Sequence, residues 1–188
     1  MKVGIIGFGR LGKLITKYLA KDFDVFVYDK NLDTKSVKEF NATSASLKEA
    51  CSSKIVIPSV PISEFEGCLL EMVPFLNENT LVIDVCSVKC HPISAMERHL
   101  PDNVQILGTH PMFGPDSAAK SLFGAKIVLC KVRIDDDKYQ DIHTYLESHG
   151  LKVIEATAKK HDKDISSSLY SHILSAELLW IFELKICL

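Results

Sequence analysis

Short apolar segments alternate with longer amphipathic segments along most of the chain. Residues 2–8, 24–29 and 53–61 are apolar runs rich in valine and isoleucine, a composition typical of strands buried on both faces. Between the first two runs, residues 10–20 place their apolar side chains at the spacing of one helical face. The pattern therefore begins with a strand, a helix and a second strand.

The alternation continues to about residue 156. The pattern predicts further strands at 80–89, 103–112, 125–132 and 151–156, and further helices at 62–76, 92–100 and 135–150. Buried strands that alternate with helices are typical of α/β folds. We therefore expect residues 1–157 to form a doubly wound, Rossmann-type sheet that is mainly parallel.

The pattern changes at residue 158. Residues 158–188 contain no strong helix breaker and predict one long helix, whose last part is rich in Leu, Ile, Trp and Phe. Such a helix is not stable when its apolar side chains are exposed to water. We expect it to pack either on another copy of the chain or on further protein.

Charge and composition argue against several kinds of partner. The 22 Lys and Arg nearly balance the 24 Asp and Glu, without a basic run, which disfavours nucleic acid and anionic membranes. No apolar run approaches the about 20 residues that cross a bilayer, and the N-terminus enters a strand rather than a signal peptide. The six cysteines lack metal-ligand spacing, so we expect no metal and a reducing, cytoplasmic location.

A glycine-rich turn joins the first strand to the first helix. Its sequence, GFGRLG, has the GxGxxG spacing of dinucleotide-binding turns. Gly7 would permit the tight turn, Gly9 would let a pyrophosphate approach the backbone, and Gly12 would let helix and strand pack closely. The anion would lie at the positive end of the helix. The predicted cofactor contacts of this turn are Gly7, Phe8, Gly9, Arg10, Leu11 and Gly12.

Two further features predict where the rest of a dinucleotide would lie. Asp29 ends the second strand, where a carboxylate accepts hydrogen bonds from a ribose diol and repels a 2′-phosphate. This favours NAD, while the neighbouring Lys30 leaves NADP open. Ser59 and Pro61, after the third apolar run, would line the cofactor crevice unless the prolines simply end the strand. Asp29 could likewise cap the following turn.

Polar residues end the next two predicted strands. Ser87 and Lys89 follow the strand within 80–89, and His110 ends the one within 103–112, in the segment ILGTHPMFGP. Because the carboxyl ends of parallel strands share one edge, these side chains would lie beside a bound nicotinamide. An imidazole there can accept a proton. Each residue also has a purely structural reading: a satisfied histidine, a serine cap or a solvated lysine.

The C-terminal helix carries a third polar group. His161 and His172 are 11 residues apart, close to three helical turns, so both imidazoles would project from one face, with Ser168 on the same stripe. The stripe would either line a substrate pocket or face solvent.

Taken together, these segments resemble the prephenate/arogenate dehydrogenase family, and in particular the plant-type arogenate enzymes. The segments that carry the resemblance are GIIGFGRLGKLITKYL, LVIDVCSVK, ILGTHPMFGPDS, KVRI and EATAKKHDKD. THPMFGP together with DVCSVK is far more specific than the glycine turn. The resemblance runs through nearly all 188 residues.

The resemblance implies an activity and roles for the residues. Such enzymes use NAD or NADP to decarboxylate prephenate or arogenate oxidatively in tyrosine biosynthesis. His110 would take the proton of the ring hydroxyl, Ser87 would hold His110 or that hydroxyl, and His161 and His172 would contact the substrate. Family members carry a longer helical domain that forms a dimer and supplies an arginine for a substrate carboxylate. Residues 158–188 would then be a shortened dimerisation and substrate domain, and the chain a homodimer.

Two other readings stay open from the sequence. One is a non-catalytic module that binds NAD(H) or acts through dimerisation. The other is a dehydrogenase of the β-hydroxyacid or imine-reducing kind, which shares the glycine turn but has no need of THPMFGP.

Overall fold

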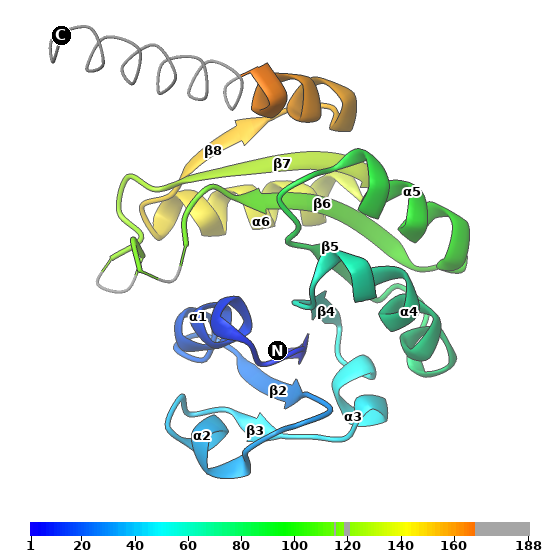
Figure 1. The fold of residues 1–188 in the computed structure, drawn as a ribbon, viewed down its shortest axis with the longest axis vertical. Helices are drawn as coiled ribbons and strands as arrows, with labels where there is room; N and C mark the ends of the chain where they lie inside the picture. The colour runs from blue at the N-terminus through cyan, green and yellow to red at the C-terminus, as the bar shows by residue number, and fades with distance from the viewer. Residues whose placement is uncertain (115, 119–120, 168–188) are drawn as a thin grey trace, which may run out of the picture.

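The computed structural model describes residues 1–114, 116–118 and 121–167. Within them the strands form one sheet of eight, ordered β3-β2-β1-β4-β5-β6-β7-β8, from the bottom of Figure 1 to its top. The strands are β1 (Lys2–Ile6), β2 (Asp24–Tyr28), β3 (Thr43–Ser44), β4 (Ile55–Pro58), β5 (Leu81–Asp84), β6 (Gln105–Pro111), β7 (Lys126–Arg133) and β8 (Lys152–Glu155). The helices are α1 (Arg10–Leu19), α2 (Thr34–Lys38), α3 (Leu47–Cys51), α4 (Ile62–Met72), α5 (Cys90–His99) and α6 (Asp136–Ser148), with a 3-10 turn η1 (Val73–Phe75).

The sheet is mainly parallel, as the sequence predicted. Strands β1 to β6 all pair in parallel, β7 runs antiparallel to β6, and β8 is parallel to β7. Strand β1 pairs with both β2 and β4, so the strand order reverses between β1 and β4. A reversal of this kind opens a crevice at the carboxyl ends of the strands, where doubly wound folds bind their ligands.

Each face of the sheet is covered by its own layer of helices and its own core. Buried side chains of α3, α4 and α5, including Phe65 and Met96, pack on one face. Side chains of α1, α2 and α6, including Val37 and Tyr139, pack on the other. The central strands β1, β4 and β5 are therefore buried on both sides, which explains their continuous apolar runs.

The strands and helices predicted between residues 2 and 156 are all present, most with shorter bounds, while α5 begins two residues earlier than predicted. Gly150 follows α6 with a φ of +81°, the left-handed conformation of a glycine that ends a helix. The sequence analysis predicted no element for residues 34–51, where the structure forms α2, β3 and α3. Helix α3 begins with a capping box, in which the Ser46 side chain accepts from Glu49 N–H and the Glu49 side chain accepts from Ser46 N–H. That S-x-x-E spacing was the available signal.

The C-terminal segment is helical over residues 158–167, where the description ends. None of the helices that the structure describes has both the length and the apolar character needed to cross a membrane.

Candidate active site

The glycine turn has the geometry that its sequence predicts. Gly7 has a φ of +100°, and a Cβ there would lie 2.7 Å from the Ser59 carbonyl oxygen. A Cβ on Gly12 would lie 2.2 Å from the Gly7 carbonyl oxygen, whereas one on Gly9 would meet no atom within 4 Å. Packing therefore requires Gly7 and Gly12, and the space above Gly9 is open at the N-terminus of α1. The turn fits a pyrophosphate group.

Gly12→Ala is expected to disrupt this turn. The added methyl group would overlap the Gly7 carbonyl oxygen, so α1 must move away from β1. We expect the free energy of unfolding to fall by about 1–3 kcal/mol, as for other overpacked sites, and NAD affinity to fall at least tenfold. Denaturant unfolding and calorimetric titration with NAD measure the two effects. Ser94→Ala, at an exposed position of α5 away from this cavity, is the control; equal losses in both variants would contradict the assigned role of Gly12.

Asp29 connects the turn to the end of β2. Its Oδ2 accepts a hydrogen bond from Phe8 N–H at 2.7 Å, and its Oδ1 accepts one from Asn31 N–H at 2.8 Å. Each carboxylate oxygen keeps accepting capacity for a second donor, such as a ribose hydroxyl. Asp29 therefore has a structural role, as its alternative reading proposed, and remains available to a ligand.

A cavity of about 450 Å³ lies beside Asp29. Ser59 and Pro61 line it, as predicted, together with Lys30 and Glu71. The Ser59 hydroxyl is buried and has no hydrogen-bond partner within the described ranges. A buried polar group without a partner is costly, so this hydroxyl fits a contact with a polar ligand. The cavity has the size and the polar groups that a nucleoside site requires.

The remaining residues of the turn are placed differently. The Phe8 ring is in the core against Phe40, at 5.6 Å between centroids, and its N–H is bonded to Asp29. Arg10 is exposed and pairs with both carboxylate oxygens of Asp116 at 2.6 and 2.7 Å. Leu11 is half-buried. Phe8 therefore shapes the turn, and Arg10 lies at the cofactor end of α1 with its charge already paired.

His110 lies near the carboxyl end of β6 and contacts the C-terminal segment. Its Nδ1 is 2.9 Å from Nε2 of His161, and the two rings meet edge to face. His161 is almost fully buried, and its Nδ1 is 2.8 Å from Oδ1 of Asp162. The prediction that His161 shares a site with His110 fits this contact, but the imidazole faces His110 rather than an open pocket. His172 and Ser168 lie outside the described residues.

Burial and hydrogen bonds control the charges of His110 and Asp162. Burial lowers the pKa of His110 to about 4, with further contributions from His161 and Lys89. Burial alone would raise the pKa of Asp162, but hydrogen bonds from Cys90 N–H, His161 and Lys89 N–H lower it to about 2. At neutral pH His110 is therefore an uncharged imidazole that can accept a proton, and Asp162 is a carboxylate.

The structure contradicts both readings of Lys89, as a solvated lysine and as a side chain open to a bound nicotinamide. Its side chain is fully buried, and its ammonium group donates to Oδ1 of Asp84 and to the carbonyl oxygen of Thr109. Burial raises the pKa of Asp84, and the Lys89 charge and the N–H groups of Cys86 and Thr109 oppose that effect. Lys89 thereby joins the end of β5 to the residue that precedes His110. Sequence alone could not reveal this, because the partner carboxylate is itself buried in a strand.

Ser87 is exposed in the turn between β5 and α5. Its side chain makes no hydrogen bond to the described part of the chain, so it does not hold His110; His161 occupies that position. Ser87 remains at the same sheet edge, free to contact a substrate. The residue that sequence reasoning missed is Asp162, and the signal was its place directly after His161 in the segment KKHDKD.

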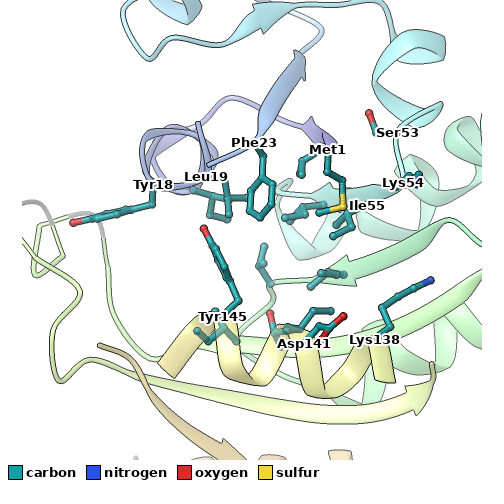
Figure 2. A pocket seen from close by; sticks show the side chains of 18 of the residues that line it. Met1, Tyr18, Leu19, Phe23, Ser53, Lys54, Ile55, Lys138, Asp141 and Tyr145 are labelled. Carbon is teal, nitrogen blue, oxygen red and sulfur yellow. The ribbon is translucent and has the colours of Figure 1, made fainter. Parts of the chain in front are cut away.

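A cavity of about 930 Å³ lies on the face of the sheet that α1 and α6 cover. It is lined mainly by apolar side chains between α1 and α6, and Figure 2 shows Tyr145 of α6 and Phe23 facing each other across it. Thr109 and Pro111 line this cavity, but His110 between them does not. Side chains alternate across a strand, so this cavity is separate from the candidate site.

The reversal of strand order, the glycine turn and the carboxylate after β2 together define a dinucleotide-binding domain of the Rossmann type. Residues 15–155 match the family described as prephenate dehydrogenase, nucleotide-binding domain. The chain belongs to this family. The matched span begins after the glycine turn, so the turn supports nucleotide binding independently.

Relatives with similar sequences have related names. A probable arogenate/prephenate dehydrogenase of Methanocaldococcus jannaschii is 33% identical over 160 residues, which cover 81% of this chain and 35% of that protein. Arogenate dehydrogenase 2, chloroplastic, of Arabidopsis thaliana is 30% identical over 179 residues, which cover 86% of this chain and 48% of that protein. The chain therefore spans less than half the length of these two curated relatives.

Solved structures show the same fold. The crystal structure of Synechocystis arogenate dehydrogenase has a TM-score of 0.74 at 24% identity, covering 88% of this chain and 63% of that one. An imine reductase from Myxococcus stipitatus in complex with NADP+ has a TM-score of 0.70 at 12% identity, covering 94% and 62%. The fold alone therefore does not select the reaction.

Proposed function

We propose that this chain is the nucleotide-binding part of an NAD(P)-dependent dehydrogenase that oxidatively decarboxylates prephenate or arogenate in tyrosine biosynthesis. The observation that carries the proposal is the uncharged, half-buried imidazole of His110 at the same sheet edge as the glycine turn. Two of its relatives are named for these substrates, and a prephenate dehydrogenase from Aquifex aeolicus, similar in fold, is described in complex with hydroxyphenyl propionate and NAD+.

The chemistry requires one base and an oriented substrate. Bound NAD supplies the nicotinamide ring that takes up the hydride. As that hydride leaves the ring carbon of the substrate, His110 accepts the proton of the hydroxyl on the same carbon, and a carbonyl forms. The bond to the ring carboxylate then breaks, carbon dioxide leaves, and its electron pair makes the ring aromatic. The phenolate oxygen takes the proton back from His110, so the reaction releases no net proton.

The test is turnover by the purified chain. The chain is incubated with NAD and either prephenate or arogenate, and the absorbance of the reduced cofactor is followed, while NAD binding is measured separately by calorimetry. Turnover of either substrate is the expected result. NAD binding without turnover, in the chain and in a form extended by the helical region of its relatives, would instead support a non-catalytic NAD(H)-binding module.

We propose NAD as the preferred cofactor. Asp29 would meet the adenine ribose, and the positive charge of Lys30 is paired with Glu71 at 2.8 Å, which makes Lys30 less available to a 2′-phosphate. Both features support NAD over NADP.

Asp29→Ser is expected to lower the affinity for NAD relative to NADP by about tenfold. The variant loses a charged acceptor for the ribose diol and the repulsion of a 2′-phosphate. Calorimetric titration with both cofactors gives the ratio. Asp24→Ser, at the start of the same strand, is the control. An unchanged NAD-to-NADP ratio in Asp29→Ser would remove Asp29 from the ribose site.

The proposal extends to the assembly and the location of the protein. Residues 158–188 would begin a helical region that contributes to the substrate site and to a homodimer. The five cysteines within the described ranges are free thiols, which supports a reducing compartment such as the cytoplasm.

A further inference from the structure

Asp162, on the C-terminal helix, links the N-terminus of α5 to His161, which in turn contacts His110 on β6. Its Oδ1 is 2.8 Å from Nδ1 of His161 and accepts from Lys89 N–H at 2.7 Å, and its Oδ2 accepts from Cys90 N–H at 2.8 Å. Lys89 is the N-cap of α5 and Cys90 is its first residue, so the N–H groups of both have no partner within the helix. One carboxylate thus caps α5 and holds His161 against His110.

With a single proton on each ring, the hydrogen bonds assign where each proton lies. A carboxylate can only accept, so Nδ1 of His161 must carry the proton in the bond to Asp162. In a neutral imidazole the other nitrogen is then an acceptor, so Nε2 of His161 accepts from Nδ1 of His110. The same rule leaves Nε2 of His110 without a proton. The nitrogen that faces away from His161 is therefore the basic one.

We propose that Asp162 is a positioning residue that acts through His161 to hold His110 in the tautomer whose Nε2 is the proton acceptor. This inference rests on the proposed function for its effect on turnover, but not for its effect on the tautomer. When His110 takes up a proton, His161 still accepts from it, and the Asp162 carboxylate stabilises the positive charge through the ring between them. The cap on α5 keeps the carboxylate fixed during the reaction.

The surroundings of the group agree with this arrangement. Around the two imidazoles lie the Asp162 carboxylate, to which the Cys90 thiol is hydrogen-bonded, and the ammonium of Lys89, which is bound to Asp84 and the Thr109 carbonyl. The positive charge of Lys89 disfavours protonation of His110 in the resting state. The Asp162 carboxylate favours protonation, but only through the ring of His161 that lies between them. The resting imidazole is thus uncharged and its orientation is set by Asp162.

The test is Asp162→Asn. The asparagine has one acceptor oxygen for three donors. When that oxygen accepts from Cys90 N–H, the amide group takes the place of Oδ1 and faces both Nδ1 of His161 and Lys89 N–H. His161 should then carry its proton on Nε2 and donate to Nδ1 of His110, which moves the proton of His110 to Nε2. Nitrogen-15 NMR of the imidazoles should show Nδ1–H for His110 in the unchanged protein and Nε2–H in the variant. Turnover should fall by about 10²–10⁴-fold, the range expected when a general base is lost or held in the wrong tautomer, with NAD affinity unchanged.

Asp164→Asn is the matched control, because Asp164 is an exposed carboxylate two residues along the same helix. It should leave the tautomer and turnover unchanged. If Asp162→Asn lowers only the unfolding temperature and His110 keeps Nδ1–H, Asp162 is merely a helix cap and the proposal is overturned. If the tautomer shifts as expected but neither the unchanged protein nor its extended form turns over either substrate, the positioning role stands and the proposed function fails.

Discussion

His110→Asn is expected to lower turnover by about 10²–10⁴-fold, the usual contribution of a general base. The asparagine amide nitrogen lies near the position of Nδ1 in histidine, so it can still donate to His161. The variant loses Nε2, the nitrogen that accepts the proton of the substrate hydroxyl. The NAD site is built from other strand ends, so its affinity should not change. The measurement is the rate of reduced-cofactor formation, with calorimetric titration of NAD.

A matched variant separates this effect from a general loss of histidine. His99→Asn changes a histidine at the end of α5 that is paired with Glu66 at 2.5 Å, away from the carboxyl ends of the strands. It should leave turnover within about twofold. Full turnover by His110→Asn would exclude His110 as the base, and a parallel loss of NAD binding would indicate damage to the fold instead.

Lys89→Met is expected to lower the free energy of unfolding by about 3–5 kcal/mol, the cost of breaking a buried ion pair by removing one partner. Methionine fills a similar volume, so the main effect is electrostatic. Asp84 would remain fully buried without its cation, and the Thr109 carbonyl would lose its donor. Urea unfolding followed by circular dichroism measures the change.

Two further variants test the reason for the loss. Lys131→Met breaks an ion pair with Asp136 that is exposed, so it should cost far less than Lys89→Met. The double variant Lys89→Met with Asp84→Leu removes both buried charges and should recover a large part of the stability. If Lys89→Met costs no more than Lys131→Met, the buried pair is not a stabilising element of this fold.

Local patterns predicted the elements that have strong periodicity. The apolar runs of β1, β4 and β5 and the single apolar face of α1 were sufficient, because a strand buried on both sides can have few polar residues. The short elements between residues 34 and 51 were not predicted, since five-residue helices carry too few turns to show a period. Their signal lay in the capping box of Ser46 and Glu49.

The candidate site also contains residues that could be predicted from the sequence and residues that could not. The glycines of the turn could be predicted from their spacing, because Gly7 takes a positive φ and Gly12 packs on the Gly7 carbonyl group within the same turn. Parallel strand ends share an edge, so His110 and Ser87 could also be placed beside it from the sequence. The partner of His110 could be only partly predicted: His161 was named, but for a substrate pocket, and the helical period linked it to His172 rather than to Asp162.

The sequence by itself determined that this chain is a doubly wound nucleotide-binding domain, because the buried strands and the glycine turn each depend on residues that are close together in the sequence. Only the tertiary structure decided which groups surround the imidazole of His110. Lys89 binds the carbonyl oxygen of Thr109, 20 residues away, and Asp162 meets α5 from a segment more than 70 residues away. Contacts between distant segments depend on how helices pack on the sheet, and no local pattern records them.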